Sequence, residues 1–193
     1  SSQNPELDSI VKNKPRIILL NKCDVANPNA TSLWIKNFES KGAYAIPVDC
    51  KTGKGLNKFD ETVKKALVGV IERNDLKGMS GKPLRLMVVG IPNTGKSSFI
   101  NRMGKNSKAK VADKAGVTQH NQWFVVGNGI ELLDTPGVLW PKFDDPEVGD
   151  KLAFIGSVKD EVTDKETIAC RLLETLYKTN PSAIEERYKI ILQ

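Results

Sequence analysis

The segment from Gly90 to Ser97 combines glycines, a lysine and a hydroxyl group in the order G-I-P-N-T-G-K-S. This order matches G-x-x-x-x-G-K-[ST], a loop whose backbone N–H groups surround the phosphates of a nucleotide. The glycines let the backbone approach closely, Lys96 bridges the β- and γ-phosphates, and the Ser97 hydroxyl binds Mg²⁺. We therefore expect a phosphate-binding loop (P-loop) that consists of Pro92, Asn93, Thr94, Gly95, Lys96, Ser97 and Ser98.

A second motif, N-K-C-D at Asn21 to Asp24, indicates which base the nucleotide carries. The Asp24 carboxylate can accept hydrogen bonds from both N1–H and the exocyclic amine of guanine, whereas adenine has no matching pair of donors. Asn21 can pair with the base edge and connect neighbouring loops, and the Lys22 stem can lie over the purine ring. A backbone N–H group that contacts the guanine carbonyl oxygen is expected from Asp49, Cys50 and Lys51.

A third motif, D-T-P-G at Asp134 to Gly137, contains groups that can respond to the γ-phosphate. Asp134 can hold Mg²⁺ through water, and the Gly137 N–H can contact the γ-phosphate. Thr118 lies in a polar, aperiodic loop, and its hydroxyl can complete the Mg²⁺ shell when GTP is bound. The expected Mg²⁺ ligands are Ser97, Thr118 and Asp134. The expected catalytic residues are Lys96, Thr118 and Gly137.

Hydrolysis also needs a water molecule in line with the γ-phosphate, and many GTPases orient it with a glutamine directly after D-x-x-G. This chain has Val138 at that position, and an apolar side chain cannot orient water. We therefore expect slow hydrolysis unless another group is supplied. The single histidine, His120, is either a general base or, as the simpler interpretation, a solvated loop residue.

The elements that would position these motifs alternate between strand and helix. Short apolar runs at 16–20, 43–48 and 84–89 are typical of buried parallel strands, and each precedes one motif. Glycine and asparagine at 127–129 predict a hairpin between strands at 122–126 and 130–133. Helical patterns cover residues 33–41, 55–74, 97–103, 148–155, 166–177 and a short segment after Pro181.

This arrangement predicts an α/β fold, a P-loop GTPase of the Ras-like type with a mostly parallel sheet flanked by helices. The base-reading motif precedes the P-loop, so the motif order is circularly permuted. We expect a GTPase domain over residues 1–143 and the start of a helical C-terminal domain over 144–193.

Charge and cysteine content narrow the choice of partner and compartment. The 29 Lys and Arg residues exceed the 23 Asp and Glu residues, which gives a net charge of +6. This excess suits either a polyanionic partner or simply a soluble basic surface. The three cysteines are far apart and odd in number, so they indicate neither disulfides nor a metal site. We therefore expect reduced thiols in a cytoplasmic protein. We expect no membrane span, because no apolar stretch approaches 18 residues.

These motifs in this order resemble the circularly permuted GTPases of the ribosome biogenesis GTPase A (YlqF/RbgA) family. The resemblance rests on D-T-P-G-V-L-W-P-K-F at 134–143, on the P-loop, and on the leading S-S-Q-N-P. It implies a GTPase that matures the large (50S) ribosomal subunit by contacting rRNA and ribosomal proteins, with hydrolysis accompanying release. We expect the protein to be a monomer. It also implies further sequence at both ends, including a histidine proposed to help catalysis and the rest of a helical RNA-binding domain.

The same resemblance suggests K⁺ as an activating ion, because Asn93 matches an asparagine that helps to bind K⁺ in related GTPases. A structural asparagine that satisfies the loop is the alternative. A different function on the same fold is a GTP-dependent regulatory switch or a tRNA-modifying GTPase. An ATP-dependent enzyme would require the N-K-C-D motif to be accidental. Lysines near Thr118 either contact rRNA or are solvated, and they are Lys105, Lys108, Lys110 and Lys114.

Overall fold

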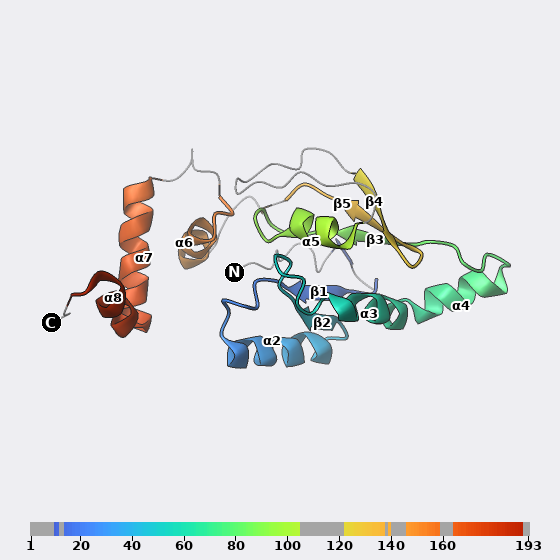
Figure 1. Cartoon of the computed structure of the whole chain (residues 1–193), viewed down its shortest axis with the longest axis horizontal. Coiled ribbons are helices and arrows are strands. Elements are labelled where there is room, and N and C mark those ends of the chain that lie inside the picture. The colour runs from blue at the N-terminus through green and yellow to red at the C-terminus, as the bar shows by residue number, and fades with distance from the viewer. Residues whose placement is uncertain are drawn as a thin grey trace.

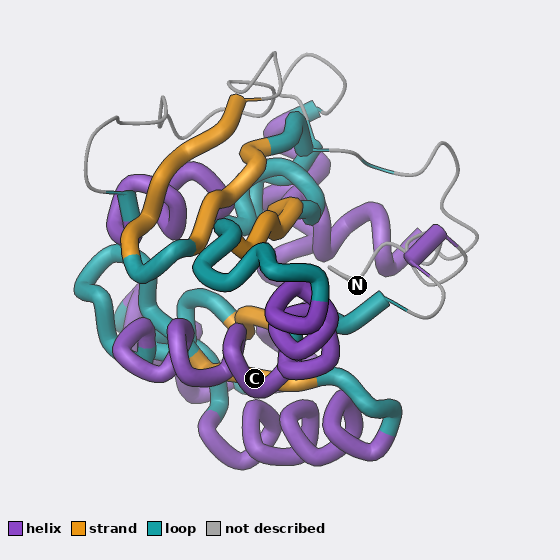
Figure 2. Tube along the Cα trace, turned by 90° about the vertical axis from the view of Figure 1, so that its right-hand side faces the viewer, coloured by secondary structure: helices purple, strands orange, loops and turns teal. Residues whose placement is uncertain are grey.

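The computed structural model describes residues 10–11, 14–104, 122–137, 139, 146–158 and 164–190. Strand β1 (Ile17–Leu20) is parallel to β2 (Tyr44–Pro47). In a second sheet, β3 (Leu84–Val88) is parallel to β5 (Ile130–Asp134), and β5 is antiparallel to β4 (Gln122–Gly127). The expected α/β architecture with parallel strand pairs is present. The expectation of one continuous sheet is wrong for the described residues, because their strands form two sheets, which Figure 2 shows as two groups.

The two sheets share one core because each is covered by a helix and the two helices touch. Helix α5 (Lys96–Met103) packs on β4 and β5, and α3 (Phe59–Ala66) packs on β1 and β2. Phe59 of α3 meets Phe99 of α5 edge to face, with ring centroids 5.0 Å apart. Burial of such aromatic pairs is a large favourable contribution to folding. This core supports the strand ends that carry the motifs.

The remaining helices follow the order that the sequence predicts, with one difference. The helix expected over 55–74 is interrupted at Leu67, where φ is −110°. Val68 and Gly69 follow the break, and both residue types have weak helix propensity. In chain order, the structure has α2 (Pro28–Ser40), the 3-10 helix η1 (Leu56–Lys58), α3, α4 (Val68–Leu76), α5, α6 (Pro146–Phe154), α7 (Lys165–Thr179) and α8 (Pro181–Tyr188).

The second sheet buries only one of its faces, which corrects the expectation of a strand buried on both faces at 84–89. Met87 of β3 is 62% exposed, and Trp123 of β4 is 48% exposed. Trp123 therefore lies on the exposed face of the sheet. There the Arg85 guanidinium lies 5.2 Å from the centroid of the Trp123 ring and 2.8 Å from the Glu131 carboxylate. An apolar run alone does not show whether one face or both will be covered.

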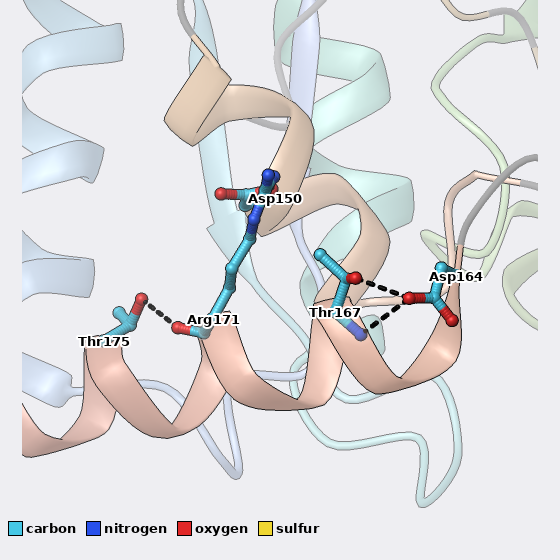
Figure 3. Close-up of polar contacts among 5 residues, drawn as sticks. All are labelled: Asp150, Asp164, Thr167, Arg171 and Thr175. Atoms are coloured by element: carbon cyan, nitrogen blue, oxygen red, sulfur yellow. Dashed lines mark hydrogen bonds and ion pairs between the residues drawn. The ribbon is translucent and has the colours of Figure 1, made fainter.

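The helical part of the chain begins with α6, which lies between the α7–α8 pair and the strands (Figure 1). Asp164 caps the N-terminus of α7 by accepting hydrogen bonds from the backbone N–H groups of Glu166 and Thr167. Arg171 of α7 reaches α6 through an ion pair with Asp150 at 2.7 Å (Figure 3). The domain boundary expected at residues 143 and 144 stays a prediction. Among the described residues, no helix is long and apolar enough to span a membrane.

Candidate functional site

The three motifs lie on loops that leave the carboxyl ends of parallel strands. Because the carboxyl ends of parallel strands lie at one edge of a sheet, such loops commonly form ligand sites in α/β proteins. The loop after β1 is joined to the end of β2 by a hydrogen bond from the Cys23 N–H to the Val48 carbonyl, at 3.1 Å. The loop after β5 is joined to β3 by a hydrogen bond from the Thr135 hydroxyl to the Val88 carbonyl, at 2.7 Å.

Asn21 connects the two sheets at this edge. Its side-chain nitrogen donates to the Thr94 carbonyl of the P-loop at 2.8 Å. Its side-chain oxygen accepts from the Cys50 N–H at 3.0 Å. Gly95 makes this approach possible, because a Cβ atom there would overlap the Asn21 amide. The loop-connecting role that the sequence suggests for Asn21 is therefore seen directly, while its pairing with a base stays a prediction.

Two other residues of N-K-C-D are exposed, whereas Cys23 is partly buried. Asp24 and Lys22 are exposed, so the Asp24 carboxylate is accessible to a ligand. Lys22 has a φ of +59°, in the left-handed region that non-glycine residues seldom adopt. Such conformations persist where the surrounding structure determines them, and they cluster at functional sites. The backbone of this motif is thus set by the loop and not by local propensity.

The P-loop surrounds the Lys96 ammonium with its own carbonyl groups. Lys96 Nζ donates to the Gly90 carbonyl at 3.0 Å and to the Ile91 carbonyl at 2.9 Å. Burial lowers the pKa of Lys96, and the negative charge of Asp134 acts in the opposite direction. Helix α5 begins at Lys96, so the positive end of its dipole faces the same loop. The loop therefore concentrates cationic and N–H groups where a phosphate would be expected.

Two oxygen atoms that could bind a metal lie together beside Lys96, and such a pair suits a divalent cation. The Ser97 hydroxyl donates to the Asp134 carboxylate at 3.2 Å, and Asp134 is only 2% exposed. Hard oxygen ligands of this kind are those that Mg²⁺ prefers, usually with phosphate and water completing the shell. Among the described residues, no group of three or more His, Cys, Asp or Glu could hold a metal alone. The residues thus fit an ion that is shared with a phosphate.

Asp49 has a role that the sequence did not reveal. The side chain is buried and accepts hydrogen bonds from the Lys51 N–H at 2.8 Å and from Thr52. The pKa of Asp49 is lowered, chiefly because the Thr52 hydroxyl donates to its carboxylate. Its carboxylate therefore shapes the loop after β2. The N–H groups of Cys50 and Lys51 both donate within the protein, so their expected contact with a guanine carbonyl stays a prediction.

Pro92 and Asn93 of the P-loop contact residues from two later parts of the chain. A Cβ atom on Gly137 would lie 2.8 Å from the Pro92 Cα, so the D-T-P-G motif touches the P-loop. The Asn93 side-chain nitrogen donates to the Gly156 carbonyl at 2.5 Å. The Ser157 hydroxyl donates to the Pro92 carbonyl at 2.7 Å. Sequence reasoning missed Gly156 and Ser157, because a serine 65 residues away carries no motif.

Several expected positions lie outside the described residues. They are Thr118, His120, Val138, Lys105, Lys108, Lys110 and Lys114. Of the expected catalytic residues, the structure describes Lys96 and Gly137. Ser98 lies in the first turn of α5 and is partly buried.

Comparison with known proteins finds relatives that match nearly the whole chain. Residues 85–187 match the family described as 50S ribosome-binding GTPase. The chain is 45% identical to "Ribosome biogenesis GTPase A" of Priestia megaterium, over 98% of this chain and 66% of that protein. It is 38% identical to "Short integuments 2, mitochondrial" of Arabidopsis thaliana, over 91% of this chain and 47% of that protein. The chain thus spans about two thirds of the length of the relatives from Priestia megaterium and Bacillus pumilus.

Solved structures agree with these relatives. The fold is similar to the GDP-bound structure of "TM YlqF", with a TM-score of 0.54 and 29% identity over 84% of this chain and 60% of that one. It is also similar to GNP-bound YlqF from T. maritima, with a TM-score of 0.55 and 29% identity over 84% of this chain and 58% of that one. The chain belongs to the ribosome biogenesis GTPase A family, within the 50S ribosome-binding GTPases.

Proposed function

We propose that this chain binds guanine nucleotides and hydrolyses GTP to GDP, as the nucleotide-dependent part of a cytoplasmic factor that assembles the large ribosomal subunit. One observation carries the proposal. Asn21 bonds to both the P-loop and the loop after β2, which puts the N-K-C-D motif beside a phosphate-binding loop. Because the base and the phosphates of one nucleotide are covalently linked, the N-K-C-D motif and the P-loop must lie at a fixed separation to bind both. The similar YlqF structures are GDP-bound and GNP-bound, which supports guanine nucleotides as ligands.

The side chains divide the work of binding. Lys96 would exchange its bonds to the Gly90 and Ile91 carbonyls for bonds to the β- and γ-phosphates. Asp24 would select guanine by accepting hydrogen bonds from its N1–H and its exocyclic amine. When bound, Mg²⁺ would neutralise developing charge on the phosphates, and Ser97, Asp134 and Thr118 would hold it. The Gly137 N–H would respond to the γ-phosphate.

Hydrolysis is proposed to be slow in the isolated protein. Val138 cannot orient water, so the ribosomal particle or another group must complete the site. Asn93 is proposed to help bind an activating K⁺, whose charge would take over part of an arginine's role. In the described structure the Asn93 side chain is held in place, because its amide donates a hydrogen bond to the Gly156 carbonyl.

A ribosomal partner also suits the charge of the chain, which is +6. At the amino ends of β1 and β2, a hollow of about 320 Å³ is lined in part by Lys14, Arg16, Lys41 and Tyr44. Cationic side chains around an aromatic ring suit an RNA backbone with an unstacked base. We propose that the protein acts as a monomer on this partner and does not insert into membranes.

The proposal is tested by measuring GTP turnover with and without purified large ribosomal subunits, in K⁺ and in Na⁺ buffers. We expect subunits to raise the rate, and the rate in K⁺ to exceed that in Na⁺. The Lys96→Ala variant serves as the inactive control. If intact protein shows no stimulation by subunits, the chain is better explained as a GTP-dependent switch with another partner. If ATP competes with bound GDP as well as GTP does, guanine binding itself is wrong.

A further inference from the structure

We propose that the turn after α6, formed by Gly156 and Ser157, positions Pro92 and Asn93 of the P-loop for nucleotide binding. The inference rests on the proposed function and goes beyond it, because these two residues lie outside every nucleotide-binding motif of the chain. They belong to the helical segment that follows D-T-P-G. We refer to Gly156 and Ser157 as the α6 turn.

The contact between Ser157 and Pro92 is buried on both sides. Ser157 is 0% exposed, and Pro92 is also buried. The Ser157 hydroxyl donates to the Pro92 carbonyl at 2.7 Å. If the hydroxyl is removed, this carbonyl loses a partner in a place that water reaches poorly, and an unsatisfied buried acceptor is costly. The P-loop backbone at Pro92 therefore depends on a residue 65 positions away.

The contact between Gly156 and Asn93 fixes a side chain as well as a backbone. Asn93 has a φ of +57°, which asparagine tolerates better than most residues. Its side-chain nitrogen donates to the Gly156 carbonyl at 2.5 Å. Because the side-chain amide is planar, holding the nitrogen also sets the direction of the oxygen. The α6 turn thus orients the residue that is proposed to approach the phosphates and K⁺.

Pro92 is held from two directions. Gly137 of D-T-P-G approaches it closely, since a Cβ atom there would lie 2.8 Å from the Pro92 Cα. Ser157 contacts its carbonyl. A segment proposed to respond to the γ-phosphate and a segment of the helical part therefore contact the same P-loop residue. A shift of either segment would therefore change the position of the P-loop backbone at Pro92.

Two backbone hydrogen bonds join the α6 turn to the end of its helix. The Ser157 N–H donates to the Leu152 carbonyl at 2.9 Å, and the Gly156 N–H donates to the Ala153 carbonyl at 2.9 Å. This pair of bonds is the Schellman arrangement, which requires a residue with positive φ, here Gly156 at +68°. Leu152 is 0% exposed, which anchors α6. The turn can therefore hold the P-loop only while α6 keeps its place.

Glycine substitution offers a matched test, because α4 ends in the same way as α6. Gly78 has a φ of +67°, and its N–H bonds to the Asp75 carbonyl while Met79 bonds to Asn74. Alanine at Gly78 would meet nothing within 4 Å, whereas alanine at Gly156 would lie 3.2 Å from the Asn93 amide nitrogen. Gly156→Ala and Gly78→Ala therefore carry the same backbone strain, and only the first disturbs the P-loop.

The measurement is the dissociation rate of a fluorescent GDP analogue from the full chain. We expect Gly156→Ala to accelerate dissociation about three- to tenfold, and Gly78→Ala to stay within about twofold of the original protein. Equal rates for the two variants would overturn the inference. If the original protein does not bind GDP, the proposed function fails instead, so the two failures are distinguishable.

Ser157→Ala is the second variant, because it removes the hydroxyl at nearly constant volume and so should fold even if Gly156→Ala does not. Its control is Ser182→Ala, whose hydroxyl bonds only to the nearby, exposed Asn180 side chain in the described structure. We expect faster GDP dissociation for Ser157→Ala alone. In an Asn93→Gly background, Gly156→Ala should have a smaller effect than in the original protein. Full additivity would contradict the contact with Asn93.

Discussion

The nucleotide end of the molecule and its helical end are held together in different ways. Around the P-loop, side-chain hydrogen bonds join residues far apart in sequence, by 73 positions for Asn21 and Thr94 and by 37 for Ser97 and Asp134. In α7, the bonds at Asp164 and Thr175 span two to four positions. The first region exists only when the whole fold assembles. The second depends mainly on local sequence.

Burial follows the same division. In the shared core, Val63 and Ile100 are 0% exposed, whereas Leu173 and Tyr177 of α7 are 40% and 50% exposed. Substitutions at the nucleotide end should therefore change nucleotide binding, and in places folding as well. Substitutions in α7 that leave the Arg171 ion pair with α6 intact should change only local stability.

The largest effect is expected at Lys96. Lys96→Ala removes a partly buried ammonium whose pKa is lowered by burial and which the P-loop carbonyls hold in place. We expect affinity for GDP to fall on the order of 100-fold, since hydrogen bonds to charged groups are the strong ones. Titration with a fluorescent GDP analogue measures this. A loss smaller than twofold would mean that Lys96 does not meet the phosphates.

Asn21→Ala should reduce both binding and stability. The substitution removes the bonds to Thr94 and Cys50, and we expect the free energy of unfolding to fall by about 1–3 kcal/mol. Chemical denaturation measures this loss. Asp24→Ala is the matched control, because Asp24 is exposed and its removal should change stability by less than about 0.5 kcal/mol. Similar stability losses in both variants would contradict the connecting role of Asn21.

Asp164→Ala should show the reverse behaviour. This residue caps α7, so its loss should destabilise the helix by about 1 kcal/mol. GDP affinity should be unchanged, because the cap is local. Circular dichroism on heating and a GDP titration measure the two quantities. A drop in GDP affinity would show that α7 and the nucleotide end are coupled more tightly than their contacts indicate.

The effect that is smallest near pH 7 concerns the thiol of Cys50, because its ionisation matters only at alkaline pH. Burial raises the pKa of Cys50 to about 11, from an ordinary value of 9.0. The folded chain keeps this proton where the unfolded chain loses it, so the stabilising contribution is full below pH 9 and is lost between pH 9 and about 11. We expect the free energy of unfolding, measured by chemical denaturation, to fall more steeply over that pH range in the original protein than in Cys50→Ala. The exposed Cys170 supplies the control, since Cys170→Ala should not alter the pH dependence.

The sequence was most informative where chemistry fixes the residue types. The P-loop, the strands before it and the β4–β5 hairpin were predictable, the last because Asn128 and Gly129 both take positive φ in its turn. The split into two sheets was not, because apolar strands of this kind do not specify their neighbours. The contacts of Asp49 and Ser157 were also hidden, since they depend on packing between distant segments.

The central claim is that Asp24 reads guanine beside the P-loop, and the most direct test compares two nucleotides on one variant. Asparagine at position 24 offers one donor and one acceptor, which suits xanthine, where a carbonyl replaces the exocyclic amine of guanine. We predict that Asp24→Asn binds GDP at least about tenfold more weakly than the original protein and gains affinity for xanthosine diphosphate. Unchanged GDP affinity with no gain for the xanthine nucleotide would contradict the claim.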